Sequence, residues 1–397
     1  MLKDIISIIA LLINQGVQGQ EIVPEVVCTL PGELAENSGM VVLNDSLFMF
    51  HNDSGHEPCV YLVDDRCALL KKICIRNAKN TDWEDAAVDS KGFIYLADMG
   101  NNRNNRKTVQ VYKFHQDLLF QENDHITADK IEITYAGNFP PGDLMYDVES
   151  IYWHNDSLYF FSKNRRVPFD GISWVFSIPD QPGMYDHVEP MDSVRIPGIS
   201  RYTSWVTSAD FEAASGTLLL LGQNKVTAFS NGHTLLPWQG EQTVISLGQF
   251  SQKEAIGFGN AYIFISDEAF KNLPGPQLYR FPKKMLYELL GLDLHLLPID
   301  YKVKAAESEV SDTLQITFIL PFETKVGYEI FNTEGDRVKV MSPSIHKTGF
   351  QRLYVDVSTL LPAPYVINLI VDEQPNALIF KRIRGENESL EKFFQKN

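Results

Sequence analysis

A unit of two short apolar strands joined by a polar turn recurs five times along the chain. Each unit opens on a Glu or a Ser, and its turn is built from Asn, Asp, Ser or Gly. The opening residues, spaced 46 to 65 residues apart, are Ser38, Glu84, Glu149, Ser208 and Glu254. A single hairpin cannot bury both of its apolar faces, so this recurrence predicts blades packed radially around an axis. We therefore expect an all-β chain folded as a β-propeller.

The number of hairpins predicts five blades of four strands each. The fifth hairpin is followed by only one further β segment, Gln277 to Phe281, before a helix-like run. The segment from Ile22 to Leu30 leads directly into the first hairpin, so we expect it to supply the missing outer strand of the last blade. Closing the ring in this way removes two unpaired strand edges. A degenerate sixth blade between Lys225 and Gly248 is the alternative.

The chain is acidic, which restricts its partners. Its 397 residues include 35 Lys and Arg against 51 Asp and Glu, and the net charge is −16. A surface of this sign repels nucleic acid and anionic membranes, so neither is an expected partner. The same charge attracts cations.

The first residues have the pattern of a cleavable signal peptide. Lys3 precedes an apolar run from Ile5 to Ile13, and Val17-Gln18-Gly19 forms a small-residue cleavage site. This run is about half of the roughly 20 residues that a membrane span needs, and no later segment is apolar enough. We expect a secreted or cell-surface protein. Its predicted parts are a signal peptide at 1–19, the propeller at 20–297, a second domain at 298–384 and a polar tail at 385–397.

Export permits disulfides, and all four cysteines lie early in the chain, at Cys28, Cys59, Cys67 and Cys74. We predict a bridge between Cys59 and Cys67, although a two-residue turn at Asp64-Asp65 would place Cys67 opposite Leu62. Buried free thiols are the alternative.

After about residue 297 the hairpin repeat ends and alternating strands follow, which predicts a small β-sandwich. This part resembles the C-terminal sorting domain of proteins that the type IX secretion system of Bacteroidota exports. The matching segments are Ser311-Asp312-Thr313-Leu314, Tyr328 to Asn332, and Val357 to Leu360. The resemblance implies contact with secretion machinery. The usual Pro-Asn-Pro start is replaced by Ala306-Glu307-Ser308, and an ordinary accessory sandwich is the alternative.

The opening residues of the five hairpins are candidate metal ligands. In a propeller the innermost strands bring them to one mouth of the central channel, so three carboxylates and two hydroxyls converge there. Ca²⁺ takes six to eight oxygen ligands, and Ser38, Glu84, Glu149, Ser208 and Glu254 would supply five. Without a cation the carboxylates would raise one another's pKa values. In the alternative interpretation each residue only hydrogen-bonds the neighbouring blade.

The same hairpins resemble two groups of known propellers. The order Ser, Glu, Glu, Ser, Glu is similar to the calcium ring of calcium-activated apyrases, as are the segments HNDSGHEPCVY and ESIYWHNDSLYFFSKNRR. That resemblance implies a five-bladed propeller with a central Ca²⁺ that hydrolyses nucleoside di- and triphosphates. The segments DWED and DMGNN also resemble secreted bacterial propellers of the SdiA-regulated and esterase-like phytase groups.

Two functions from different classes follow from these features. In the first, an exported propeller with a largely structural Ca²⁺ binds a small molecule or a cell-surface partner at its channel mouth. In the second, the protein is a Ca²⁺-dependent phosphoester or nucleotide phosphohydrolase that uses the same channel site. A carboxylate there would orient water, and cationic side chains would hold phosphate oxygens. The candidate catalytic residues are Asp53, Asp98, Lys163, Arg165, Arg166 and Asp267, with Glu268 beside them. No G-x-S-x-G, H-E-x-x-H or P-loop motif is present, which argues against serine hydrolases, zinc proteases and nucleotide motors.

Overall fold

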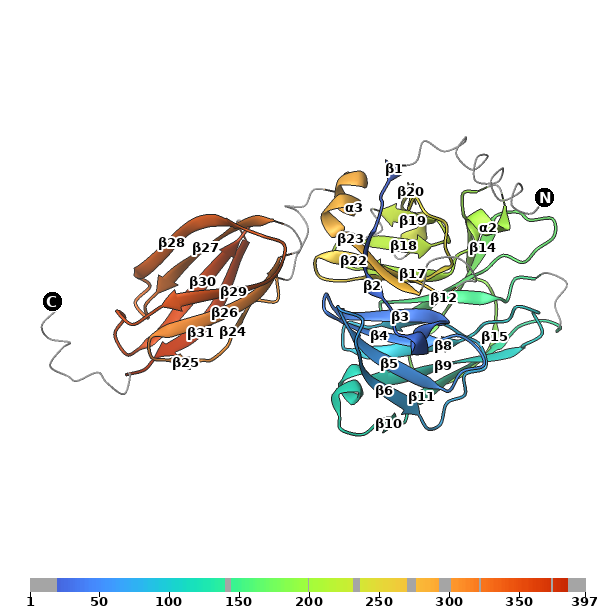
Figure 1. Ribbon diagram of the computed structural model, residues 1–397, viewed down its shortest axis with the longest axis horizontal. Coiled ribbons are helices and arrows are strands. Elements are labelled where there is room, and N and C mark those ends of the chain that lie inside the picture. Colours follow the sequence, from blue (N-terminus) through green and yellow to red (C-terminus); the bar gives the residue numbers. More distant parts are fainter. Residues whose placement is uncertain are drawn as a thin grey trace, which may run out of the picture. The chain divides into compact units, whose positions relative to one another are not determined.

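The computed structural model describes residues 20–139, 144–198, 200–230, 236–269, 276–292, 301–320, 323–372 and 374–384. The predicted signal peptide and polar tail lie outside these residues. The chain divides into two compact units, Met1–Gly259 with Ile263–Phe281, and Asn260–Tyr262 with Pro282–Asn397. Both are built from β-strands, as expected (Figure 1). Among the described residues, no helix is both long enough and apolar enough to cross a membrane.

The described part of the first unit contains five sheets of four or five strands, and each holds one of the predicted hairpins. The first comprises β3 (Asn37–Asn44), β4 (Leu47–Asn52), β5 (Cys59–Asp64), β6 (Leu69–Ile75) and β10 (His125–Ile126). The second comprises β7 (Trp83–Val88), β8 (Phe93–Asp98), β9 (Thr108–His115), β11 (Asp129–Tyr135) and β15 (Gly183–Val188). The third comprises β12 (Val148–His154), β13 (Ser157–Ser162), β14 (Ile172–Pro179) and β16 (Asp192–Arg195).

The remaining two sheets take strands from both ends of the unit. The fourth comprises β17 (Ser208–Glu212), β18 (Thr217–Leu221), β19 (Lys225–Ser230), β20 (Glu241–Ser246) and β1 (Gln20–Glu21). The fifth comprises β21 (Lys253–Phe258), β22 (Tyr262–Asp267), β23 (Gln277–Pro282) and β2 (Glu25–Thr29). Short helices η1 (Gly32–Leu34), η2 (Gln116–Phe120), α2 (Arg201–Ser204) and η3 (Pro237–Gln239) lie in the connections. The segment considered for a sixth blade supplies β19 and β20, which are outer strands of the fourth sheet.

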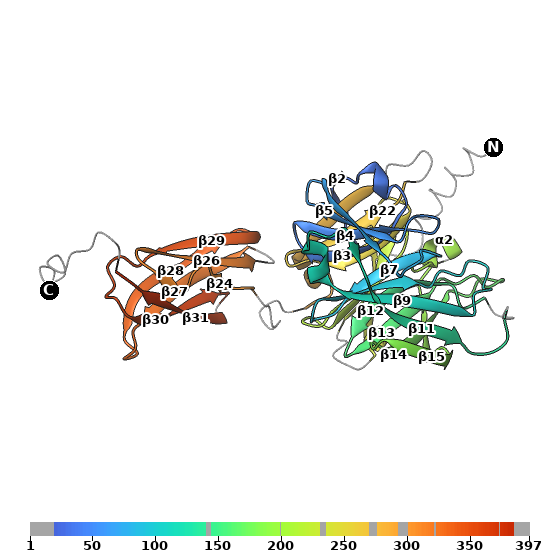
Figure 2. The same ribbon diagram turned by 90° about the horizontal axis from the view of Figure 1, so that it is seen from below.

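The first strand of each hairpin lies next to its counterparts in the neighbouring sheets. β3 contacts β7, β7 contacts β12, β12 contacts β17, β17 contacts β21, and β21 returns to β3. Apolar side chains fill the space between adjacent sheets, as where Tyr95 and Val111 of the second sheet pack with Ile151, Phe160 and Phe176 of the third. This arrangement is consistent with a propeller of blades (Figure 2).

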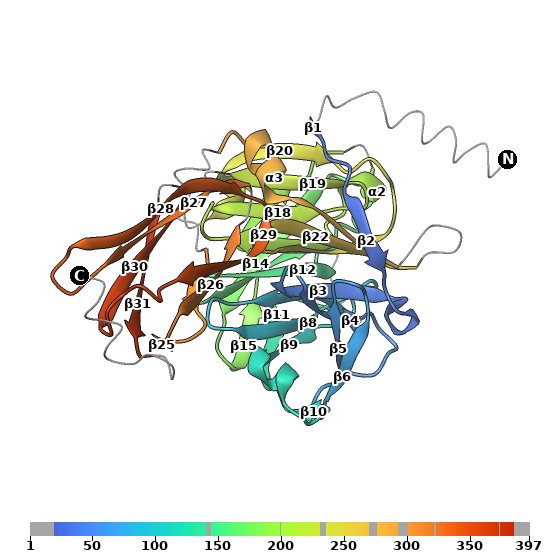
Figure 3. The ribbon, with the colours of Figure 1, turned by 60° about the vertical axis from the view of Figure 1, so that its left-hand side comes forward.

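The N-terminal segment closes this ring of contacts. β2 pairs antiparallel with β23, from Glu25 opposite Arg280 to Thr29 opposite Gln277, in the sheet that contains Glu254 (Figure 3). This confirms the prediction that the segment supplies that outer strand. β1 runs parallel to β20, so the same segment also extends the fourth sheet. Between the two strands, Ile22 is buried.

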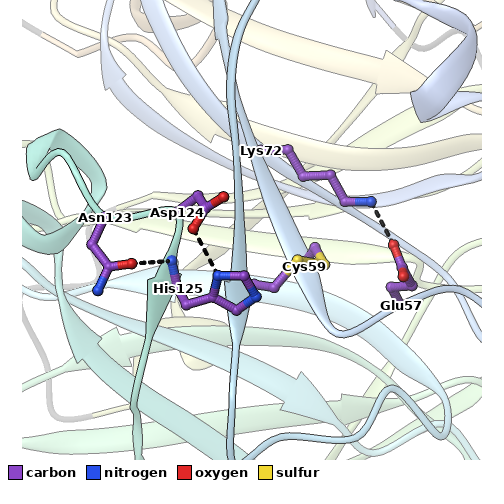
Figure 4. Close-up of a disulfide and its surroundings, with 7 residues drawn as sticks. Glu57, Cys59, Lys72, Asn123, Asp124 and His125 are labelled. Atoms are coloured by element: carbon purple, nitrogen blue, oxygen red, sulfur yellow. Dashed lines mark hydrogen bonds and ion pairs between the residues drawn. A yellow bond between two sulfur atoms is a disulfide. The ribbon is translucent and has the colours of Figure 1, made fainter.

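Two disulfides connect the four cysteines, and the predicted Cys59 to Cys67 bridge is wrong. Cys59 bonds to Cys74, its direct cross-strand partner on β6 (Figure 4), and Cys67 bonds to Cys28 on β2. Antiparallel pairing brings Cys59 and Cys74 together, whereas Cys67 lies in the turn after β5 at φ 59°. The Cys28–Cys67 bridge ties the closing strand of the fifth sheet to the first sheet.

Removing the bridge between the two sheets should therefore destabilise the first unit. Cys28 and Cys67 are 39 residues apart. Closing a loop of this length stabilises a fold by about 4 kcal/mol in the chain-entropy model. We expect C28S/C67S to lower the free energy of unfolding by about that amount in urea titrations. The control pair C59S/C74S opens a 15-residue separation and should lose about 3 kcal/mol. An unchanged urea midpoint in C28S/C67S would refute the closing role of the bridge.

The second unit consists of two sheets around one apolar core. One comprises β24 (Lys304–Ala305), β26 (Thr313–Leu320) and β29 (Gly349–Asp356). The other comprises β25 (Glu309–Val310), β27 (Thr324–Phe331), β28 (Arg337–His346), β30 (Pro364–Val371) and β31 (Gln374–Arg382). Leu314 and Phe318 from the first sheet share the core with Ile330 and Ile367 from the second. Helix α3 (Lys283–Leu289) also belongs to this unit.

Candidate metal centre at the ends of the inner strands

Four of the five predicted ligand residues lie at irregularities in their strands. The pairing register of β3, β7, β12 and β21 shifts by one residue at Ser38, Glu84, Glu149 and Glu254, respectively. A bulge of this kind leaves the extra residue unpaired in the ladder and changes the direction of its side chain. All four residues are buried.

In the fourth sheet the equivalent residue is Thr207 rather than Ser208. Ser208 pairs regularly with Leu221, without a register shift. The N–H groups of Ile151 and Ala209 both donate to the same carboxylate oxygen of Asp85, so these two residues occupy equivalent places in their strands. Ile151 lies two residues after Glu149, and Ala209 lies two residues after Thr207. The ring therefore comprises Ser38, Glu84, Glu149, Thr207 and Glu254.

The two hydroxyl groups of this ring connect neighbouring sheets. Ser38 donates to the carbonyl of Glu84 at 2.8 Å, and Thr207 donates to the carbonyl of Lys253 at 2.7 Å. For these residues the geometry agrees with the alternative interpretation, in which ring residues hydrogen-bond the next blade. The hydroxyl of Ser208 donates to Asp85 at 3.0 Å.

Asp85 connects three inner strands just beyond the ring. Its carboxylate accepts from Ile151 of β12 at 3.0 Å and from Ala209 of β17 at 3.2 Å. Burial raises the pKa of Asp85 well above its usual range, although these hydrogen bonds act to lower it. The missing side chain of Gly39 leaves room for His51 and Asp85. A Cβ at Gly39 would lie 2.1 Å from the imidazole Nε2 of His51 and 3.0 Å from the Cα of Asp85.

A second set of equivalent positions lies where the second strand of each hairpin ends. The N–H groups of Asp53, Gly100, Lys163 and Glu268 donate to carbonyls two residues before the respective ring residue. These carbonyls belong to Glu36, Asp82, Asp147 and Gln252. Four sheets therefore present an acid, a glycine, a lysine and an acid around the ring.

Three carboxylates converge between the first and second sheets. Ligand oxygens of Asp53, Asp82 and Glu84 all lie within 4.8 Å of one another. Gly100 makes this approach possible: a Cβ at Gly100 would lie 2.0 Å from Glu84 Oε1 and 2.6 Å from the Asp82 carboxyl group. This acidic triad, Asp53, Asp82 and Glu84, could hold a metal ion.

The carboxylates of the site bind protons more strongly than ordinary ones. Burial, followed by repulsion from Glu149 and Asp53, raises the pKa of Glu84 well above its usual range. Burial and the neighbouring Asp53 raise the pKa of Asp82 to about 6. Burial also raises the pKa of Glu254 to about 8 and that of Glu268 to about 7. Such shifts mean that the site favours protons or another cation over bare negative charge.

Glu149 differs because two cationic side chains neutralise it. Lys163 Nζ lies 2.8 Å from one of its oxygens and an Arg165 nitrogen lies 3.3 Å from the other. Although burial opposes it, these charges lower the pKa of Glu149. Arg165 also pairs with Asp147, and the Trp205 ring lies 5.1 Å from Lys163 Nζ and 4.9 Å from the Arg165 guanidinium carbon.

The other candidate catalytic residues bind partners mainly outside this cluster, although the Asp98 carboxylate also accepts from the N–H of Asp82 at 2.9 Å. Asp98 accepts from Arg106 at 2.9 Å and from Gln110 at 2.6 Å. Asp267 accepts from the Gln277 N–H at 2.8 Å and the Tyr279 hydroxyl at 2.7 Å. Arg166 pairs with Asp170 at 2.7 Å. Asp98 and Asp267 therefore bind the third strands of their own sheets, β9 and β23, and Arg166 binds within the loop after β13.

Asp82, Thr207 and Gly100 are site residues that the sequence pattern did not predict. Asp82 lies two residues before Glu84, so a regular strand would point both side chains to the same face. That spacing was the available signal. The bulge and the space beside Gly100 depend on the packed structure.

No model of a known protein family and no curated protein matches the chain. Among solved structures, the chain is similar to PorZ, a bacterial surface component of the type-IX secretion system of Porphyromonas gingivalis, with 11% identity and a TM-score of 0.30. That match covers 88% of this chain, which spans 45% of the PorZ chain. The chain is also similar to a protein of unknown function from Bacteroides thetaiotaomicron, with 10% identity, a TM-score of 0.38, and coverage of 65% of this chain and 75% of that one.

Proposed function

We propose that this protein is an exported five-bladed propeller that binds one Ca²⁺ at the acidic triad and a ligand at the adjoining mouth. The observation that carries this proposal is the convergence of Asp53, Asp82 and Glu84 within 4.8 Å. Three carboxylates at this separation repel one another unless protons or a cation neutralise them. A divalent cation with oxygen ligands satisfies all three at once.

The proposed ligand set revises the ring expected from sequence. Glu84 remains a ligand, and Asp53 and Asp82 replace the hydroxyls of Ser38 and Ser208, which donate to other groups. Glu149 and Glu254 add negative charge around the ion, with Lys163 neutralising Glu149. Ca²⁺ suits an all-oxygen set because it accepts six to eight ligands in a flexible geometry, with carbonyls or water completing the shell.

The rest of the architecture fits an exported protein. We assign the five sheets as five blades of a propeller, and the two sheets of the second unit, within the predicted bounds 298–384, as a β-sandwich that resembles a sorting domain. The two disulfides suit an oxidising compartment, in agreement with a signal peptide at 1–19. Secretion or display at the cell surface, with the second unit contacting secretion machinery, follows from these assignments.

One observation favours the phosphohydrolase as a second candidate. Lys163 and Arg165 lie beside the carboxylates, where cations could hold phosphate oxygens. Both are paired with Glu149 or Asp147, so an anionic substrate would have to compete with these carboxylates. Ca²⁺-dependent phosphate release from a panel of nucleotides and phosphoesters would establish this activity, and its absence would leave the binding role.

Calorimetric titration of chelator-treated protein with Ca²⁺ tests the site. We expect one site per chain, and we expect Glu84→Gln to weaken binding at least about tenfold, because it removes one of three charges next to the ion. Glu122→Gln, an exposed substitution of the same type, is the matched control and should bind as the wild type does. Equal affinities of wild type and Glu84→Gln would refute the proposed ligand set.

The raised pKa values predict how pH acts on the metal-free and Ca²⁺-bound forms. A carboxyl group with a raised folded-state pKa stabilises the fold while protonated, so this stability is lost as pH rises through about 6 to 8, the range of Asp82, Glu268 and Glu254. Ca²⁺ favours the charged forms and should release protons on binding. We compare pH 5.5, below this range, with pH 8.5, above it. The Ca²⁺-induced rise in melting temperature should be larger at pH 8.5 than at pH 5.5. An equal rise in melting temperature at both pH values would contradict the coupling between Ca²⁺ binding and proton release.

A further inference from the structure

The second unit has one sheet edge that lacks the usual protection against pairing. Three of its four described edge strands are short or irregular. β24 and β25 contain two residues each. β28 contains Pro343, and its register with β27 shifts twice. Short strands, prolines and bulges are the devices by which proteins prevent edge-to-edge association.

The fourth edge strand, β29, is long and regular. It pairs with β26 over eight consecutive residues, from Thr313 opposite Asp356 to Leu320 opposite Gly349, without a register shift. It contains no proline. In the part of the unit that the structure describes, no strand pairs with its other side. The Asp356 carbonyl on that side accepts from the Lys339 side chain, and the remaining backbone groups of this edge can form a further ladder.

The outer face of β29 carries exposed aromatic and charged side chains. Phe350 and Tyr354 are 59% and 61% exposed, and Arg352 lies between them with its guanidinium 5.4 Å from the Phe350 ring. On the opposite face, Val355 belongs to the apolar core. Exposed aromatic residues alternating along a bare edge are unusual for a solvent-facing strand and typical of a strand that pairs.

We propose that β29 pairs antiparallel with β29 of a second copy of this chain, forming a two-fold symmetric dimer. Opposite residues in an antiparallel pair lie on the same face, so Phe350, Arg352, Tyr354 and Asp356 of one copy face the same set in the other. A register centred on Tyr354 places the two Tyr354 rings opposite each other. It also places Arg352 of each copy opposite Asp356 of the other, which forms two ion pairs.

The charges on β29 favour this register over the two alternatives beside it. A register centred on Leu353 would place Arg352 opposite Tyr354 and form neither ion pair. A register centred on Arg352 would place the two guanidinium groups opposite each other, which is destabilising. Two hydrogen bonds from Ser358 stabilise the charged form of Asp356. The strand is thus self-complementary in charge, which favours a second copy over an unrelated peptide. The dimer is independent of the cation site.

Sedimentation velocity of the full-length protein over a range of concentrations tests this proposal. The wild type should form a dimer of the 45.0 kDa chain. Arg352→Asp and Asp356→Arg should each weaken dimerisation at least about tenfold, because each places like charges opposite each other. The double variant R352D/D356R exchanges the charges and should restore the dimer. Arg337→Asp on the protected edge β28 makes the same charge change and should leave the dimer intact.

Three results would overturn the proposal. They are a wild type that is monomeric at every concentration, single variants that dimerise as the wild type does, and a charge-exchanged variant that stays monomeric while both single variants are folded. Circular dichroism melts confirm the folding of each variant, and all three substituted side chains project from exposed or partly exposed strand positions. A monomeric wild type that binds an extended peptide would replace the second copy with a different partner.

Discussion

A chain that begins at Pro31, after β1 and β2, is expected to lose the folded first unit. The truncation removes the strand that completes the fifth sheet, the buried side chains of Ile22 and Leu30, and the bridge from Cys28 to Cys67. Each buried side chain is worth about 2 kcal/mol and the bridge about 4 kcal/mol. Together these losses come to about 8 kcal/mol, which lies within the roughly 5 to 15 kcal/mol that stabilises a whole domain.

Thermal melts monitored by near-ultraviolet circular dichroism would show this loss. The truncated chain should lack the cooperative transition of the first unit, while the second unit, which has its own core, should keep its own. Adding a synthetic peptide of residues 20–30 in trans should partly restore the missing transition, because the peptide can pair with β23. A truncated chain that melts as the wild type does would show that ring closure is unimportant.

Gly100→Ala is expected to abolish Ca²⁺ binding while leaving the fold in place. The added Cβ would lie 2.0 Å from Glu84 Oε1 and 2.6 Å from the Asp82 carboxyl group, so both carboxylates would have to move apart. Overpacking of this kind costs about 1 to 3 kcal/mol of stability. Calorimetric titration should show a loss of Ca²⁺ affinity of at least about a hundredfold, because two of the three ligands are displaced.

Gly32→Ala is the matched control for this substitution. Its added Cβ would have no heavy atom within 4 Å, and neither glycine has a positive φ. Gly32→Ala should therefore keep the stability and Ca²⁺ affinity of the wild type. If Gly100→Ala bound Ca²⁺ as tightly as Gly32→Ala, the ion could not lie between Glu84 and Asp82.

The hairpins and the closing strand could be predicted because their signals are local. Alternating apolar residues and turn residues define each hairpin. The fifth hairpin was followed by only one further strand, so the absence of a fourth strand in that blade was visible in the sequence. The disulfide from Cys28 to Cys67 could not be found in this way. It connects two sheets that only the ring of contacts brings together, so sequence spacing carries no information about it.

The candidate site was predicted in part, for a related reason. Glu84, Glu149 and Glu254 open their hairpins and lie at bulges, so the repeat itself marks them. The repeat does not mark Asp82, whose carboxyl group reaches Glu84 only because the strand bulges and Gly100 lacks a side chain. Lys163, a candidate phosphate-binding residue, pairs with Glu149 at 2.8 Å, and its sequence position does not indicate this ion pair. This pair forms within one hairpin, because the bulge at Glu149 changes the direction of its side chain.

An anomalous difference map from crystals grown with Ca²⁺ would locate the ion directly. We expect a single strong peak in the first unit, about 2.3 to 2.6 Å from oxygens of Asp53, Asp82 and Glu84, that disappears in Glu84→Gln crystals. A map with no peak at the acidic triad, or with the ion bound elsewhere while these carboxylates remain protonated, would contradict the proposed Ca²⁺ site.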